Sequence, residues 1–130
     1  TQPILQRLQS DLVSHCQFAL KGALDTAVAQ WDPRPAVGVV LAAGGYPNAY
    51  GKGHVITGLD TPWPASTKVF HAGTQAKGDT IVTHGGRVLC VSALGNTIEE
   101  AIQSAYAGVD HISWQDMIFR QDIGWRAIDR

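Results

Sequence analysis

Hydrophobic residues in the first quarter of the chain recur at helical spacing. They occupy steps of three and four residues at Leu5, Leu8, Leu12, Cys16, Ala19 and Ala23. This spacing predicts one helix from about Pro3 to Leu24 with an apolar stripe that must pack on something. Pro3 suits the first turn of a helix, where its missing N–H would have no partner. The tract Trp31–Pro35 contains two prolines and therefore predicts a linker.

Two continuous apolar runs farther along predict buried strands. Ala36–Ala43 and Val88–Ala93 are too short for helices and show no alternation of polar residues. We therefore expect each to be covered on both faces of a sheet. Shorter extended segments are predicted at His54–Ile56, Lys68–Ala72, Thr80–Thr83 and Met117–Phe119.

The tract from Thr83 to Ala101 combines a turn, a strand and a helix start. Gly85-Gly86 can take positive φ at no steric cost, which predicts a two-residue hairpin turn pairing Thr80–Thr83 with Val88–Ala93. The segment Gly73–Asp79 is expected to be a turn. Thr97 and Glu100 have capping-box spacing, with each side chain accepting from the other's backbone N–H. The helix that follows has a buried face made by Ile98, Ala101, Ile102, Ala105, Tyr106 and Val109.

Strands joined mainly by hairpins, with helices before and after them, predict an α+β fold. We expect an N-terminal helix and then a small, mostly antiparallel sheet domain with one or two packed helices. A chain of 130 residues is long enough for one modest core. The chain starts at Thr1 without an initiator Met and runs directly into a helix, so we expect a piece of a longer protein.

Charge and apolar content exclude two classes of partner. The net charge is −1, 16% of residues are charged and no basic run occurs, so nucleic-acid binding is not expected. The longest apolar run, Ala36–Ala43, is far too short to span a membrane, and no signal-peptide pattern is present. We expect a cytoplasmic protein. Cys16 and Cys90 lie far apart in the sequence and are expected to be reduced core residues.

The sequence predicts no catalytic, cofactor-binding or metal-ligating residue. Gly44–Gly53 resembles a P-loop only superficially, because five residues separate Gly45 from Gly51 and Lys52 is not followed by Ser or Thr. This loop either covers a ligand or is a plain connection. The histidines lack metal-ligand spacing, and no serine lies on a nucleophile elbow.

Arg87 is the strongest candidate for binding. A guanidinium beside a glycine-rich turn can bind phosphate or carboxylate through two hydrogen bonds, or it can be an exposed solubilising cation. His71, beside Gly73-Thr74, is either a ligand contact or a half-buried residue with a satisfied ring. Asp122 and Arg126 are expected to form a structural pair at i,i+4 spacing.

Four segments in order resemble the glycinamide ribonucleotide synthetases, also called phosphoribosylamine-glycine ligases. The segments are Gly38–Pro47, Lys68–Thr74, Gly85–Val91 and Asp122–Ile128. The resemblance implies an ATP-grasp ligase of de novo purine synthesis. Such a ligase joins glycine to 5-phosphoribosylamine through glycyl phosphate, while ATP becomes ADP and phosphate.

The resemblance also implies how the chain is divided and which residues bind substrate. Residues 1–30 would be the last helix of the ATP-grasp domain, and residues 31–130 the C-terminal domain. The sites for ATP and Mg²⁺ would lie mainly outside this chain, which would be inactive alone and need the rest of the ATP-grasp chain as partner. The predicted substrate-binding residues are Gly73, Thr74, Gly85, Gly86 and Arg87. A free-standing ligand-binding or interaction module is the alternative.

Overall fold

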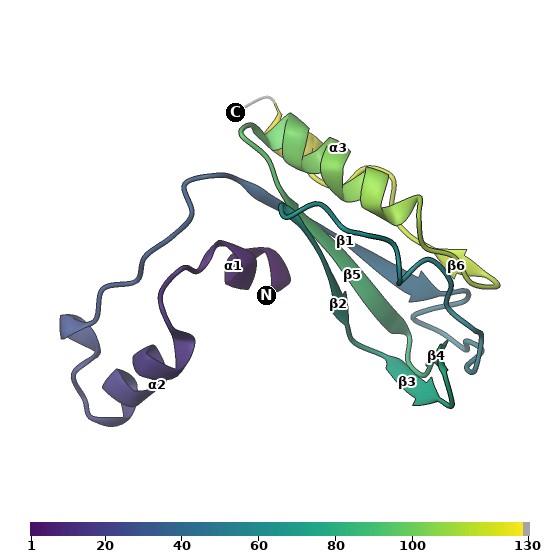
Figure 1. Ribbon diagram of the computed structural model, residues 1–130, viewed down its shortest axis with the longest axis horizontal. Coiled ribbons are helices and arrows are strands. Elements are labelled where there is room, and N and C mark those ends of the chain that lie inside the picture. Colours follow the sequence, from purple (N-terminus) through teal and green to yellow (C-terminus); the bar gives the residue numbers. More distant parts are fainter. Residues whose placement is uncertain (129–130) are drawn as a thin grey trace.

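The computed structural model describes residues 1–128 of the chain (Figure 1). Asp129 and Arg130, the end of the expected 31–130 domain, lie outside the described residues. In order, the elements are α1 (Gln2–Arg7), α2 (Leu12–Leu20), the 3₁₀ turn η1 (Leu24–Thr26), β1 (Ala36–Ala43), β2 (Thr67–His71), β3 (Thr74–Lys77), β4 (Thr80–Thr83), β5 (Arg87–Leu94), α3 (Ile98–Val109), β6 (Met117–Ile118) and the 3₁₀ turn η2 (Trp125–Ala127).

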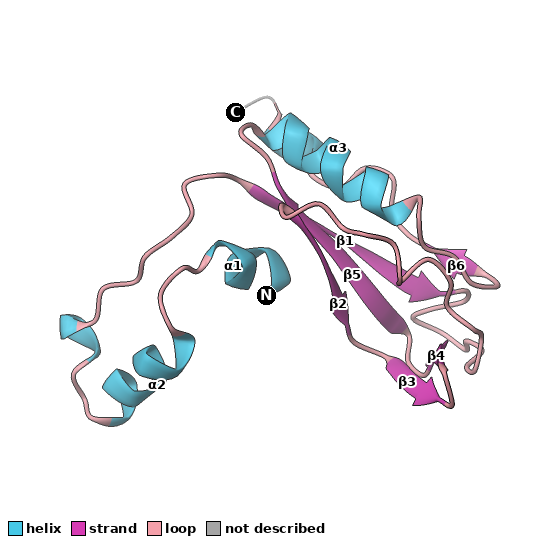
Figure 2. Cartoon of the chain, viewed as in Figure 1, coloured by secondary structure: helices cyan, strands magenta, loops and turns pink. Residues whose placement is uncertain are grey.

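A four-stranded antiparallel sheet forms the centre of the molecule (Figure 2). Its strand order is β2-β5-β1-β6, and β5 pairs with both β1 and β2. Val91 of β5 lies opposite Val39 on one side and Val69 on the other. The α+β fold with a mostly antiparallel sheet is therefore confirmed. β5 is buried along its length except at Arg87. β1 has the predicted bounds, but it is not covered on both faces along its whole length, because Val40 is 39% exposed.

Helix α3 covers one face of this sheet. Its Ala101 and Ala105 are fully buried against Val39 and Val91 in the main core. Thr97 caps the helix as predicted, because its hydroxyl oxygen accepts from the Glu100 N–H at 3.2 Å. The reciprocal bond differs from the prediction, since the Glu100 carboxylate accepts from the N–H of Asn96 at 2.8 Å.

Helix α1 lies on the opposite face of the sheet from α3 (Figure 1). The contact depends on Gly38, because a Cβ there would lie 2.8 Å from Pro3 Cγ and 3.2 Å from Cys90 Sγ. The missing side chain lets the helix approach β1 and cover Cys90, which is buried as predicted.

The single N-terminal helix predicted over Pro3–Leu24 is wrong. The helix ends where Leu8 becomes extended and bridges to Trp31. A second helix starts because the Asp11 carboxylate accepts from the N–H groups of Val13 and Ser14. No residue of α1 or α2 is fully buried, and Cys16 is exposed rather than in the core.

The predicted pairing of Thr80–Thr83 with the central strand is also wrong. Residues Thr74–Lys77, expected to be a turn, form β3 and pair with β4 across a tight turn at Gly78, whose φ is +59°. Gly85 and Gly86 do not have positive φ and form no hairpin turn. The local β3–β4 hairpin is made instead because its two strands are adjacent in sequence and joined by a suitable glycine. The strand predicted at His54–Ile56 is reduced to a single β-bridge between Val55 and Val82 of β4.

The linker is fixed to α1 through Asp32. Its N–H donates to the Arg7 carbonyl at 2.7 Å, and the Asp32 carboxylate accepts three hydrogen bonds from Arg34, one from the backbone and two from the guanidinium. These bonds from Arg34 lower the pKa of the Asp32 carboxyl to about 2 from its ordinary 3.8. Asp32 is only 8% exposed, so its ion pair with Arg34 is partly shielded from solvent.

The lowered pKa of Asp32 gives a pH-dependent contribution to stability. Because the folded state favours the charged carboxylate, this contribution is fully present above about pH 4 and is lost as the pH falls toward 2. We expect Asp32→Asn to reduce the slope of unfolding free energy against pH in this window, measured by urea denaturation. Arg34→Gln should reduce the same slope, because it removes the cause of the shift. A parent-like slope in both variants would contradict the assignment.

Candidate functional site

The structure brings four of the five predicted site residues together at the start of β5. The Gly73 N–H donates to the Arg87 carbonyl at 2.9 Å, and the Gly73 carbonyl accepts from the N–H of His84 at 2.7 Å. A Cβ on Gly73 would lie 2.6 Å from Gly85 Cα. The glycines are therefore needed for two backbone segments to cross closely, rather than for a hairpin turn. Gly86 is buried beside them and Arg87 is exposed.

The Thr74 side chain does not join this group. Thr74 is the first residue of β3, and its hydroxyl lies 3.0 Å from Nδ1 of His71, the last residue of β2. Thr74 and His71 thus hydrogen-bond to each other, which satisfies one ring nitrogen as predicted, but His71 is exposed rather than half-buried.

Arg87 lines a hollow of about 400 Å³ on the sheet face that carries α1. The hollow is lined by Val40, Ala42, Tyr46, Arg87, Ile118, Phe119 and Arg120. Val40 and Ala42 alternate with the core residues Val39 and Leu41, so they point to the other face of the sheet. Arg87 lies opposite Ala42, immediately after a register shift between Leu41 and Ala42. The shift is a local irregularity next to the arginine.

The loop after β1 packs on the glycine pair. A Cβ on Gly86 would overlap the Tyr46 ring and would lie 3.1 Å from the Tyr50 ring. The two tyrosine rings are 6.1 Å apart between centroids and tilted by 60°. The backbone is also joined here, since the Ala43 N–H donates to the Gly86 carbonyl at 2.8 Å. Tyr46 therefore packs against Gly86, the residue before Arg87, and also lines the hollow.

Arg120 also lines the hollow, although no sequence pattern indicated it. Its guanidinium pairs with the Asp122 carboxylate at 2.7 Å, and this arginine lowers the pKa of Asp122. The expected pair of Asp122 with Arg126 is wrong. Gly124 has a φ of +87°, which interrupts any helix and prevents i,i+4 geometry, and Arg126 instead lies over the Trp125 ring. No spacing rule identifies Arg120, because its place depends on where β6 ends.

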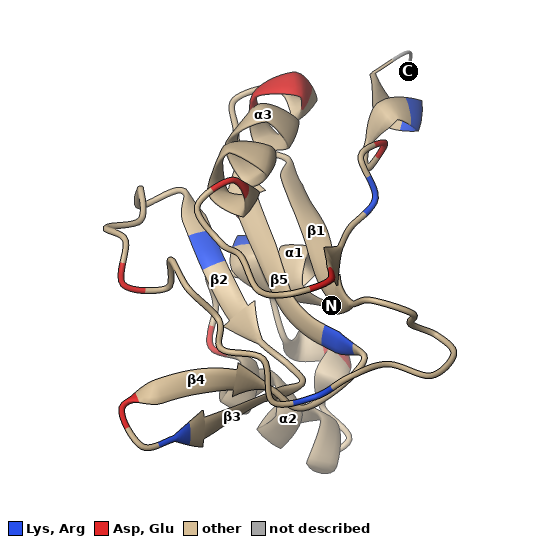
Figure 3. Ribbon diagram, turned by 90° about the vertical axis from the view of Figure 1, so that its right-hand side faces the viewer, with Lys and Arg blue, Asp and Glu red and all other residues tan. Residues whose placement is uncertain are grey.

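The basic residues lie on separate elements rather than in one continuous stripe (Figure 3). The hollow beside β5 is where two of them, Arg87 and Arg120, line a common space. Burial raises the pKa of the Cys90 thiol, so this cysteine is a poor nucleophile. Among residues 1–128, no group of three or more His, Cys, Asp or Glu side chains could hold a metal ion. Nor is any described helix long and apolar enough to cross a membrane.

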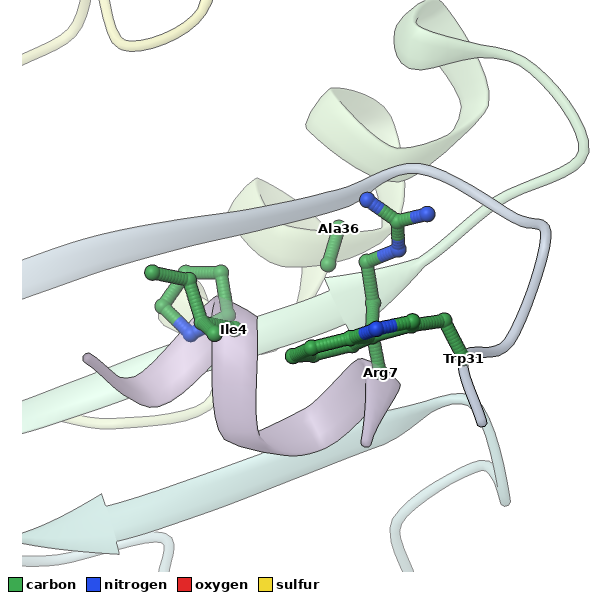
Figure 4. A pocket seen from close by; sticks show the side chains of 5 residues that line it. Ile4, Arg7, Trp31 and Ala36 are labelled. Carbon is green, nitrogen blue, oxygen red and sulfur yellow. The ribbon is translucent and has the colours of Figure 1, made fainter. Parts of the chain in front are cut away.

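A second hollow, of about 440 Å³, lies between α1 and the linker. Figure 4 shows Ile4 and Arg7 from the helix beside the Trp31 ring. Ile4 and Trp31 are exposed at 59% and 45%. Further exposed apolar side chains occur along α1, α2 and the segment that follows, at Leu5, Leu12, Val13, Phe18, Leu20, Leu24 and Val28.

Comparison with known proteins identifies relatives over the whole chain. Residues 36–126 match the family model "Phosphoribosylglycinamide synthetase, C domain". The phosphoribosylamine–glycine ligase of Vibrio cholerae is 61% identical over 130 residues, which is 100% of this chain and 30% of that protein. The ligase of the same name from Allochromatium vinosum is 59% identical with the same coverage. The chain thus spans about 30% of the length of these curated relatives.

A solved structure is similar in fold. The crystal structure of phosphoribosylamine–glycine ligase from Thermotoga maritima has a TM-score of 0.65 and 38% identity, and covers 79% of this chain and 25% of its own. These matches confirm the resemblance seen in the four sequence segments.

The contact of Gly86 with Tyr46 leads to a test by double-mutant cycle. Gly86→Ala should destabilise the protein by about 1–3 kcal/mol, because the new methyl group overlaps the Tyr46 ring. The same substitution should cost less in a Tyr46→Ala background. Gly85→Ala is the matched control, since its Cβ would meet Gly73 rather than a tyrosine and its cost should be equal in both backgrounds. Equal costs for Gly86→Ala in both backgrounds would contradict the packing described.

Proposed function

The chain belongs to the family of phosphoribosylglycinamide synthetase C domains, and on this basis we propose that it forms the C-terminal part of a phosphoribosylamine–glycine ligase. The ligase would join glycine to 5-phosphoribosylamine in purine biosynthesis, while ATP becomes ADP and phosphate. Glycine is activated as glycyl phosphate, and the amine of the sugar phosphate then attacks the activated carbonyl. The cytoplasmic location expected from the sequence stays a prediction.

The role proposed for this chain is to bind the phosphate of the sugar substrate. The observation that carries the proposal is the position of Arg87, exposed at the edge of a hollow and joined to no acidic side chain among the described residues. A guanidinium donates to two phosphate oxygens at once and keeps its charge at any physiological pH. Gly73, Gly85 and Gly86 support its backbone. Thr74 stays a predicted substrate contact on the neighbouring hairpin.

The described residues do not fit a magnesium site, because no cluster of acidic or histidine ligands is present among residues 1–128. In this proposal ATP and Mg²⁺ therefore bind elsewhere in the ligase, on its ATP-grasp part. The residues of this chain bind and orient the sugar phosphate and exclude water from one side of the reaction.

The remainder of the ligase is the proposed partner of the N-terminal segment. Residues 1–30 are proposed as the end of the ATP-grasp domain, and residues 31–130 as the C-terminal domain. The exposed apolar side chains of α1, α2 and the linker support this, because surfaces of this kind are covered by another domain or protein in most cases. The hollow at Trp31 is lined by two of these exposed side chains, Ile4 and Trp31.

A chimera tests the proposed function. This chain would replace the matching 130 residues of the Vibrio cholerae ligase, to which it is 61% identical along its whole length. We expect the chimera to form ADP in a reaction that requires both glycine and phosphoribosylamine, and the 130-residue chain alone to form none. A correctly folded chimera without this activity would reject the ligase proposal and favour a free-standing ligand-binding module.

Arg87→Ala in the chimera tests the role of the arginine. We expect kcat/KM for phosphoribosylamine to fall by the equivalent of about 2–3 kcal/mol, the size of a lost charge-assisted hydrogen bond. Arg126→Ala is the control, because Arg126 is exposed and does not line this hollow. An Arg87→Ala variant with unchanged kcat/KM for phosphoribosylamine would remove Arg87 from the site.

A further inference from the structure

The hollow beside β5 carries two cations, of which Arg87 alone is used by the proposed function. We propose that Arg120 is a second phosphate-binding residue, and that the hollow takes a phosphorylated sugar between the two guanidinium groups. This inference rests on the proposed function for the identity of the sugar phosphate. It adds a residue and a subsite that the sequence segments did not indicate.

The charge of the ligand argues for two cations. A phosphate monoester carries between one and two negative charges near neutral pH and offers three acceptor oxygens. One exposed arginine can satisfy two of these oxygens and one charge. A second guanidinium lining the same hollow can satisfy the rest. Arg87 comes from the start of β5 and Arg120 from the segment after β6, so the two reach the hollow from different elements.

The backbone of Arg120 is held in place while its side chain stays accessible. The Tyr106 hydroxyl, on α3, donates to the Arg120 carbonyl at 2.7 Å and accepts from the Ile123 N–H at 3.0 Å. The Phe119 ring lies 6.3 Å from the Tyr106 ring between centroids. These contacts tie the segment to the core helix. A binding residue needs this combination of a fixed backbone and a solvent-exposed guanidinium.

The ion pair with Asp122 does not prevent this role. The Arg120 side chain is 71% exposed and the Asp122 side chain 52%, and ion pairs this open to water stabilise little. In the absence of ligand the Asp122 carboxylate is hydrogen-bonded to the Arg120 guanidinium. A phosphate of higher charge can displace this carboxylate from the guanidinium. Asp122 is thus a competitor for Arg120 rather than an essential partner.

The apolar part of the hollow suits the sugar. Val40, Ala42 and Ile118 supply aliphatic surface from β1 and β6, and Tyr46 and Phe119 supply aromatic rings. The C–H groups of a ribose ring can pack on such surfaces while the phosphate lies at the arginines. The volume of about 400 Å³ is in the range of small-molecule sites and exceeds the needs of a bare anion.

The test compares variants of the chimera in two independent measurements. Calorimetry with ribose 5-phosphate, which has the sugar and phosphate but no reactive amine, gives a Kd. Steady-state kinetics give KM for phosphoribosylamine, glycine and ATP. The variants are Arg120→Ala, Asp122→Asn and, as a control cation that does not line the hollow, Arg126→Ala.

We expect Arg120→Ala to raise the Kd for ribose 5-phosphate and the KM for phosphoribosylamine by about 10-fold to 100-fold. In Arg120→Ala, the KM values for glycine and ATP should stay within about twofold of the parent. In the control Arg126→Ala, the KM values for phosphoribosylamine, glycine and ATP should all stay within about twofold of the parent. Asp122→Asn should bind ribose 5-phosphate as tightly as the parent or more tightly, because it removes the competing carboxylate.

Two outcomes would overturn the inference. An unchanged Kd in Arg120→Ala would remove Arg120 from the phosphate site, even where the chimera is an active ligase and Arg87→Ala is impaired. An equal rise of Kd in Arg120→Ala and Asp122→Asn would show that the ion pair only holds the segment in place. Loss of ligase activity in the parent chimera would reject the proposed function alone, since binding of ribose 5-phosphate is measured separately.

Discussion

The burial of β5 is the constraint on which the rest of the structure depends. This strand is hydrogen-bonded to β1 and β2 at its two edges, and it is covered by α3 on one face and α1 on the other. A shift of one residue would move every buried side chain to the opposite face, so the register is strongly specified. Arg87, its first residue, therefore has a fixed place at the rim of the sheet although it is itself exposed.

Close backbone approaches convert this fixed strand into a candidate binding site. Gly73 crosses Gly85, and Gly86 lies against the ring of Tyr46. Each glycine removes a side chain where two segments meet, so that loops distant in sequence come within contact of Arg87. The same device operates at Gly38, where α1 reaches the sheet. The glycines behind Arg87 are tightly packed, whereas the side chains of Arg87 and Arg120 are exposed to solvent.

The two hollows are distinct in character. The one between Arg87 and Arg120 combines cations with aromatic and aliphatic surface, as a small anionic ligand requires. The one at Trp31 is lined by the exposed apolar side chains of Ile4 and Trp31, on the N-terminal segment proposed to contact the rest of the ligase. Family membership connects them, since relatives extend well beyond the length of this chain. In the proposed ligase, the first hollow would bind the sugar phosphate and the second would lie toward the ATP-grasp part.

The sequence by itself determined the elements whose signals are local. The apolar runs of β1 and β5, the cap at Thr97 and the buried face of α3 depend on neighbours within a few residues. The sequence also indicated Arg87 as a candidate for binding, because a cation next to two glycines is visible in one short segment. Tertiary structure decided which strands pair, where the N-terminal helix breaks at Leu8, and that Tyr46 and Arg120 line the same hollow as Arg87. These outcomes depend on contacts between residues dozens of positions apart, which no local period or spacing encodes.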